Sequence, residues 1–129
     1  MASIPSEFND LFEKPILFAL ATLMPDGQPQ VTPVWGDLSD GKPRINTAVG
    51  RQKDRNLKDR PQVTVMLVDP ADQQRWIEVR GTAIGTTEGA DADIDALAKK
   101  YLGVDSYPYR SPSETRITYT VEPTKVTHS

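Results

Sequence analysis

The segment best suited to chemistry is a run of ten residues, 51–60, that concentrates positive charge. It holds five basic residues against two acidic ones, in a chain whose formal net charge is −3. The basic residues are Arg51, Lys53, Arg55, Lys58 and Arg60, and the acidic ones are Asp54 and Asp59. If the run is a short helix, each cation in its first turn is unfavourable by roughly 0.3–1 kcal/mol unless an anion lies nearby. Free backbone N–H groups at a helix N-terminus also favour a phosphate or carboxylate. Arg51 and Lys53 therefore indicate an anion site, with a solvated basic helix as the alternative.

Outside that run, the sequence offers few groups for conventional catalysis. It contains no cysteine, which excludes disulfides, thiolate metal sites and cysteine nucleophiles. The only histidine, His128, lies too near a chain end for a serine-type triad or a histidine metal cluster, so no metal site is expected. Glu78 and Arg80 are expected to form a surface ion pair. An anion site without a nucleophile or a general base suits a protein whose coenzyme performs the chemistry.

Four aromatic residues are candidates for stacking on an aromatic ligand, although buried aromatic side chains more often belong to the core. They are Trp35, Trp76, Tyr107 and Tyr109. Of the two tryptophans, Trp35 is expected to serve packing.

Length and composition limit the class of protein. The 129 residues fit one domain, 1–129, and no stretch approaches the roughly 20 apolar residues of a membrane span. The N-terminal residues lack the basic and apolar regions of a secretion signal, so a cytoplasmic protein without a membrane partner is expected. The acidic balance, and a basic run without interleaved aromatics, argue against a nucleic-acid partner.

The first half of the chain is predicted to contain one short helix and three strands. Ser3 or Ser6 is expected to cap a helix that ends near Glu13. Alternating apolar residues and turn signals predict strands over 16–24, 29–38 and 44–49.

The second half alternates helices and strands. The basic run is predicted to be a helix over 51–60 that Pro61 ends. Strands follow over 62–68 and 75–86, and Gly81 marks a bulge or a close backbone approach in the second. The remaining predictions are a helix over 91–102, a loop over 103–112 and a strand over 116–121. Five or six strands in hairpin order favour a mainly β fold, a curled antiparallel barrel with short helices.

Three stretches of the sequence resemble the pyridoxamine 5'-phosphate oxidase-like superfamily. They are Leu20-Ala-Thr-Leu-Met-Pro-Asp-Gly-Gln-Pro-Gln-Val-Thr-Pro-Val-Trp35, Ile45-Asn-Thr-Ala-Val-Gly-Arg-Gln-Lys-Asp-Arg-Asn-Leu57 and Trp76-Ile-Glu-Val-Arg-Gly81. The resemblance implies a split β-barrel of the flavin-reductase or FMN-binding type. It also implies a homodimer, with the coenzyme in a groove shared by both subunits.

The same resemblance assigns nine residues to coenzyme binding. Thr32, Pro33 and Val34 match positions that line the flavin or deazaflavin ring, largely through backbone. Thr47 and Gly50 match positions that meet the coenzyme tail, Arg51 and Lys53 match the phosphate-binding positions, and Asn56 matches a position that supports their loop. Trp76 matches a position that reaches the coenzyme of the partner subunit.

Two departures argue against oxidation of pyridoxamine phosphate itself. Thr32 stands where the oxidases present a basic residue, and residues 51–53 read Arg-Gln-Lys where the oxidases have Ser-Arg-Lys. The form Gly-Arg-x-Lys-x-x-Asn-Leu at 50–57 instead resembles the short reductases that depend on the deazaflavin coenzyme F420. These pass a hydride from the reduced deazaflavin to a conjugated or quinone-like small-molecule acceptor.

Three alternatives stay open at this point. The coenzyme is F420 or FMN, and the protein is an enzyme or a non-enzymatic carrier of either. No residue selects a particular acceptor, and a proton that follows the hydride comes from Tyr107, Tyr109 or solvent.

Overall fold

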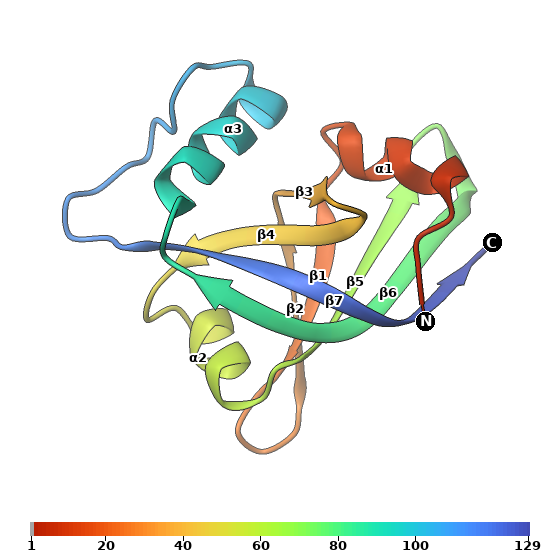
Figure 1. The fold of residues 1–129 in the computed structure, drawn as a ribbon, viewed down its shortest axis with the longest axis horizontal. Coiled ribbons are helices and arrows are strands. Elements are labelled where there is room, and N and C mark those ends of the chain that lie inside the picture. Colours follow the sequence, from red (N-terminus) through yellow and green to blue (C-terminus); the bar gives the residue numbers. More distant parts are fainter. Residues whose placement is uncertain (1) are drawn as a thin grey trace.

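Short hairpins between alternating apolar segments bring most of the chain into one antiparallel sheet (Figure 1). The computed structural model describes residues 2–129, and its element order is a 3-10 turn (Ser6–Phe8), α1 (Asn9–Glu13), β1 (Phe18–Leu23), β2 (Pro29–Val34), β3 (Gly36–Ser39), β4 (Lys42–Ala48), α2 (Gln52–Asp59), β5 (Gln62–Asp69), β6 (Asp72–Thr86), α3 (Ala90–Leu102) and β7 (Arg116–His128). The sheet runs β2-β1-β5-β6-β7-β4-β3. The mainly β class and the barrel-like fold predicted from the sequence are confirmed.

The sheet curls because its two edge strands are neighbours in the chain. β2 and β3 lie at opposite ends of the strand order, yet only Trp35 separates them. The edges must therefore meet at Trp35, which makes the sheet a half-barrel.

The prediction of a single strand over 29–38 is therefore wrong. Val34 pairs with Phe18 in β1, whereas Gly36 pairs with Ile45 in β4. The chain can change partners here because Gly36 has no side chain: a Cβ atom would lie 2.4 Å from the Phe18 ring. A glycine is required where backbone passes this close to a packed ring.

The division of 29–38 into β2 and β3 raises the strand number to seven, and the last strand is longer than predicted. β7 continues past Val121 because residues 122–128 pair with the middle of β6, from Thr82↔Glu122 to Ile77↔His128. The register shifts between Arg80 and Gly81, where a Cβ atom would lie 2.2 Å from the Glu122 carbonyl oxygen. Gly81 is thus both a bulge and a close approach, as predicted.

The helix predictions hold except at the first N-terminus. Pro5 precedes the 3-10 turn and no side chain caps it, so the expected cap by Ser3 or Ser6 is wrong. α1 ends at Glu13 as predicted. α2 ends at Asp59, two residues before Pro61, and α3 begins one residue earlier than predicted.

The apolar faces of α1 and of the central strands form the core. Leu11, Phe12, Val65 and Ile77 are each fully shielded from solvent. Burying a side chain of this size contributes roughly 1.5–3 kcal/mol. α3 and α2 lie on opposite sides of the carboxyl end of β4 (Figure 1), and that end of the sheet is where a site can form.

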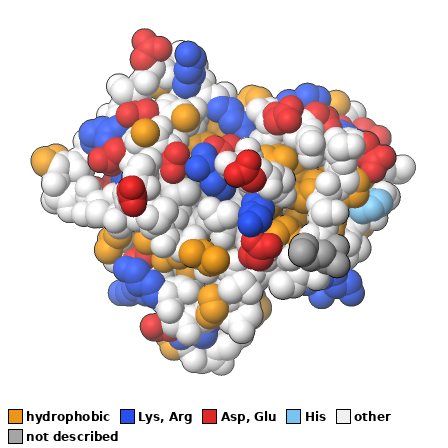
Figure 2. Space-filling model, viewed as in Figure 1, with side chains coloured by type: hydrophobic (Ala, Val, Ile, Leu, Met, Phe, Trp, Pro, Cys, Tyr) orange, Lys and Arg blue, Asp and Glu red, His pale blue; other side chains and the backbone are white. Residues whose placement is uncertain are grey.

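The surface is mixed in charge. Basic and acidic side chains are interspersed over the face shown in Figure 2, without a large patch of one sign. Within residues 2–129, no helix has the length and apolar character needed to cross a membrane.

Candidate functional site

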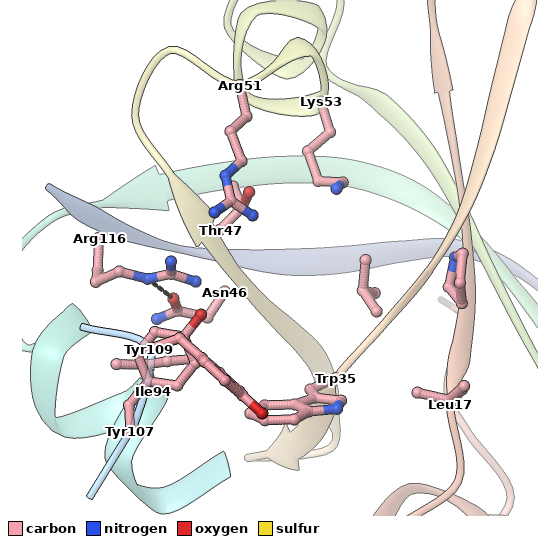
Figure 3. A pocket seen from close by; sticks show the side chains of 12 residues that line it. Leu17, Trp35, Asn46, Thr47, Arg51, Lys53, Ile94, Tyr107, Tyr109 and Arg116 are labelled. Atoms are coloured by element: carbon pink, nitrogen blue, oxygen red, sulfur yellow. Dashed lines mark hydrogen bonds between the residues drawn. The ribbon is translucent and has the colours of Figure 1, made fainter. Parts of the chain in front are cut away.

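A cavity of about 260 Å³ opens beside the carboxyl end of β4, next to the N-terminus of α2 (Figure 3). Residues from most of the elements around that end line it: Leu17, Pro33, Val34, Trp35, Asn46, Thr47, Arg51, Lys53, Ile94, Tyr107, Tyr109 and Arg116. One end is polar and basic, and the other is apolar and aromatic. This division suits an elongated ligand with an anionic end and a flat ring.

Three cations gather at the polar end. Arg51 precedes α2 and its Nη2 lies 3.0 Å from a Glu114 carboxylate oxygen. Lys53 is partly buried and, within residues 2–129, makes no ion pair, whereas Lys58 of the same helix pairs with Asp54 at 3.1 Å. Burial, with Arg51 and Arg116 nearby, lowers the pKa of Lys53. An anion in the cavity would reverse that effect, since an opposite charge favours the charged form of the amine.

The N-terminus of α2 is open toward a ligand because its acidic residue points elsewhere. No side chain caps the first turn of the helix. Asp54, in that turn, is fully buried, and its carboxylate accepts hydrogen bonds from the Gly50 N–H at 2.9 Å and the Tyr119 hydroxyl at 2.7 Å. Burial would raise the pKa of Asp54, but these bonds and Lys58 outweigh it and hold the pKa below its usual value. Asp54 thus fixes the turn at Gly50, where φ is +95°.

Thr47 supplies the clearest sign of a missing partner. Its side chain is 2% exposed, and its Oγ1 is the buried side-chain polar atom without a hydrogen-bond partner within residues 2–129. A buried hydroxyl left in this state costs about 1–3 kcal/mol. Thr47 lines the same cavity as the three cations, so the hydroxyl is placed to donate to an anion there.

Trp35 forms the aromatic end and is held rigidly. Its ring stacks on Tyr101 at 5.3 Å between centroids and 7° between planes, and Tyr107 meets it edge-on at 6.2 Å. The Tyr101 hydroxyl donates to the Ile16 carbonyl at 2.6 Å and accepts from the Gly36 N–H at 3.1 Å. Burial raises the pKa of Tyr101 to about 12, so this hydroxyl keeps its proton near neutral pH.

The loop after α3 brings Tyr107 and Tyr109 to the cavity. The Tyr107 N–H donates to Asp95 on α3 at 2.8 Å, and Arg110 pairs with Asp91 and Asp95. The ring of Tyr109 lies against that of Tyr107, with centroids 5.7 Å apart. These contacts hold the loop as one wall of the cavity.

Five of the nine predicted binding residues line this cavity: Pro33, Val34, Thr47, Arg51 and Lys53. Thr32 pairs with Leu20 in the adjacent strand, and Gly50 lies directly before Arg51; neither lines the cavity.

Asn56 and Trp76 lie elsewhere. Asn56 is buried beneath α2, where it donates to the Thr22 hydroxyl at 3.0 Å and accepts from Gln52 at 2.8 Å. It therefore braces the helix. Trp76 lies on β6 opposite Val68, away from the cavity of its own subunit.

Sequence reasoning missed Asn46 and Arg116. It named Trp35 as a candidate for stacking but favoured packing for it, whereas Trp35 lines the cavity. Asn46 and Arg116 are buried polar residues on β4 and β7. The sequence shows only a charged or amide side chain within an alternating strand, and such side chains are common on the solvated face of a sheet. Only the pairing of β4 with β7 brings the two residues together.

The described residues show no metal centre. Within 2–129, no group of three or more His, Cys, Asp or Glu side chains is arranged to hold a metal ion.

Comparisons with known proteins agree with this fold. The family model of pyridoxamine 5'-phosphate oxidase matches residues 4–128. An F420 reductase is similar in structure with a TM-score of 0.83 and 31% identity, over 96% of this chain and 98% of the other. A conserved hypothetical protein from Mycobacterium tuberculosis has a TM-score of 0.78 and 23% identity, over 99% and 85% of the two chains. General Stress Protein 26 from Bacillus anthracis has a TM-score of 0.72 and 17% identity, over 95% and 90%. No curated protein matches the sequence.

Proposed function

The chain belongs to the pyridoxamine 5'-phosphate oxidase family, and on that basis we propose that it is an oxidoreductase that uses coenzyme F420. In this proposal the reduced deazaflavin gives a hydride to a conjugated or quinone-like small-molecule acceptor. The 31% identity to an F420 reductase over almost the whole chain supports the choice of F420 over FMN.

The observation that carries the proposal is the unpaired Thr47 hydroxyl among three cations, in the same cavity as an aromatic wall. A flavin or deazaflavin coenzyme has this polarity, with a phosphate at one end and a planar ring at the other. Arg51 and Lys53 would bind the phosphate, and the Thr47 hydroxyl would donate a hydrogen bond to it. Pro33, Val34 and Trp35 would hold the ring.

The coenzyme supplies the hydride chemistry, and the protein supplies position. The aromatic wall excludes water from one side of the ring site, and the rigid stack of Trp35 on Tyr101 fixes its shape. A proton for the reduced acceptor comes from Tyr107, Tyr109 or solvent. The two hydroxyls lie on the cavity wall, so Phe variants of each separate the three sources by their effect on turnover.

In this proposal a second copy of the chain completes the coenzyme-binding groove. The outer face of β1 and β5 presents an apolar groove lined by Leu17, Ala19, Met66 and Val68, with Leu17 53% and Met66 40% exposed. An exposed apolar sheet face of this kind suits a subunit interface. Trp76, next to Val68 in the sheet, would then reach the coenzyme of the partner.

A side-by-side fluorescence titration with F420 and FMN tests the proposal. We expect tighter binding of F420, and turnover with at least one acceptor from a panel of quinones and conjugated carbonyl compounds. A purified protein that is yellow and retains FMN would favour the FMN alternative. Tight binding of F420 without turnover over the whole panel would favour a coenzyme carrier.

A further inference from the structure

Arg116, the first residue of β7, reaches the polar end of the cavity from the side opposite Lys53 (Figure 3). Its side chain is only 6% exposed, compared with 51% for Arg51. A buried guanidinium is costly unless its charge and its N–H groups find partners. The hydrogen-bond partners of Arg116 therefore indicate its role.

Arg116 is held in one orientation by three contacts. Its Nε donates to Asn46 Oδ1 at 2.9 Å and its Nη1 lies 2.7 Å from Glu114 Oε1. Its guanidinium carbon lies 5.1 Å from the centroid of the Tyr107 ring. Within residues 2–129, Nη2 makes no hydrogen bond, although it carries two N–H donors. Arg116 therefore lines the cavity with a guanidinium group whose Nη2 is available to a ligand.

Asn46 is itself fixed from behind, which makes the arrangement rigid. Its Nδ2 donates to the Ala90 carbonyl at 3.0 Å and to the Thr118 hydroxyl at 3.1 Å. Thr118 in turn donates to Asp93 at 2.8 Å. A chain of buried bonds thus runs from α3 to Arg116, and donors fixed in advance bind an anion without paying for their own ordering.

The charges at this end of the cavity do not balance. Glu114 divides its carboxylate between two guanidinium groups, with Oε1 on Arg116 and Oε2 on Arg51. Lys53 has no carboxylate partner within residues 2–129, and Arg116 is among the charges that lower its pKa. A structural ion pair would need one carboxylate for each cation, so three cations around one carboxylate leave an excess positive charge for a ligand.

We propose that Arg116 is a third anion-binding residue of this site, which closes around the phosphate together with Arg51, Lys53 and the Thr47 hydroxyl. This inference rests on the proposed function and adds a consequence to it. Because Arg116 is the most deeply buried of the three cations, it sets the preference for phosphate-bearing coenzymes over their phosphate-free forms. It has no role in binding the ring.

The test compares phosphate-bearing ligands with phosphate-free ones, and FMN and riboflavin are the pair that differs in the phosphate alone. Arg116→Gln, Arg116→Lys and the parent are titrated with F420 and its phosphate-free deazaflavin, and with FMN and riboflavin. Arg55→Gln is the control, since Arg55 is exposed on α2 and does not line the cavity. We expect Arg116→Gln to lose about ten- to a hundred-fold in affinity for the phosphorylated ligands, the effect of one charge-assisted bond. Its affinity for the phosphate-free ligands should match that of the parent. The affinity of Arg116→Lys for the phosphorylated ligands should lie between those of the parent and of Arg116→Gln.

Two outcomes would overturn the inference. An equal loss for both members of a pair would make Arg116 a packing residue, and no loss for either would place the anion elsewhere. If Arg116→Gln fails to fold, the comparison rests on Arg116→Lys, whose melting temperature shows whether it folds.

Failure of the proposed function would be distinguishable. If the parent binds neither coenzyme, inorganic pyrophosphate serves as the probe, read as a shift in melting temperature. A shift that Arg55→Gln retains and that Arg116→Lys reduces would still support the anion site, and the absence of any shift in the parent would refute it.

Discussion

At the scale of single residues, Thr47 shows how a binding site departs from the rules that stabilise a core. Its hydroxyl is buried without a partner, in a strand where its neighbours Asn46 and Ala48 are also buried. Valine has the same shape without the polar group. The difference between Thr and Val at this position therefore isolates the cost of keeping a donor ready for a ligand.

We expect Thr47→Val to raise the stability of the free protein by about 1 kcal/mol while weakening F420 binding several-fold. Denaturant unfolding measures the first effect and fluorescence titration the second. Thr22→Val is the matched control, because the Thr22 hydroxyl is buried but already accepts a hydrogen bond from Asn56. That variant should lose stability. A loss of stability in Thr47→Val would mean that the hydroxyl has a partner within the protein.

Lys53→Ala should likewise separate binding from stability. Removing the amine deletes a charge-assisted bond to the phosphate, worth about 1.5–3 kcal/mol or roughly ten- to a hundred-fold in affinity. The free protein should melt at the same or a higher temperature, since the change removes a partly buried amine whose pKa is lowered by burial and by the nearby Arg51 and Arg116.

Arg55→Ala is the control for Lys53→Ala, because Arg55 is exposed and its side chain donates to Gln52 of its own helix. Lys58 is less suitable, since it pairs with the buried Asp54. If Lys53→Ala binds F420 as tightly as Arg55→Ala does, the anion site lies elsewhere.

At the scale of elements, the bend between β2 and β3 depends on α3. Lys100 donates to the carbonyls of Phe12 and Gly36, and its amine lies 4.9 Å from the centroid of the Tyr101 ring. Lys100 therefore fastens α3 to the residue that follows Trp35. Burial lowers the pKa of this amine to about 8, only partly offset by Asp37 and Glu13.

Stability should therefore rise with pH above about 8. The pKa of Lys100 is about 8 in the folded protein, below the ordinary lysine value of 10.5, so between these two pH values the unfolded chain holds more protons. The free energy of unfolding should increase over this range. Urea unfolding at pH 7.5, 8.25 and 9.0 measures the slope before the ionisation of tyrosines, whose ordinary pKa is about 10, becomes large. Lys100→Met should flatten it, and an unchanged slope in that variant would assign the effect to another group.

Sequence reasoning succeeded for elements whose signals are local. Pro61 ends α2 and alternation marks β5, because both depend on residues near in sequence. The break at Trp35 could not be predicted in this way. It depends on Gly36 meeting the Phe18 ring and on Lys100, residues brought together only by the closed sheet.

The residues of the site likewise divide into those with a local sequence signal and those without one. Arg51 and Lys53 were recognisable because crowded cations at a predicted helix N-terminus are a local anomaly. Arg116 and Asn46 were not recognisable, since each is one of several polar residues on its strand and nothing local marks it as buried. Their bond spans 70 positions in the sequence, and no short-range pattern records it.

At the scale of the whole molecule, we expect a homodimer joined through the apolar groove on β1 and β5. Met66→Glu places a charge at the centre of that groove and should yield monomers that bind F420 weakly. Ile84→Glu is the control, because Ile84 is 66% exposed on β6 outside the groove. Sedimentation velocity at micromolar concentration distinguishes the two. A monomeric parent protein under these conditions would contradict the interface and the assignment of Trp76 to the partner's coenzyme.

The position of β7 in the sheet has a consequence for synthesis on the ribosome. β7 lies between β6 and β4, yet it is the last strand to be translated. At about 5–20 residues per second, β4 waits on the order of seconds before its neighbour exists. During that time β4 and β6 each present an unpaired edge, which is when a nascent chain is most open to aggregation and to chaperones. The same order makes the protein suited to a split reporter. A fragment that ends before Arg116 lacks an interior strand of the sheet, and a separate peptide of residues 116–128 would pair between β6 and β4.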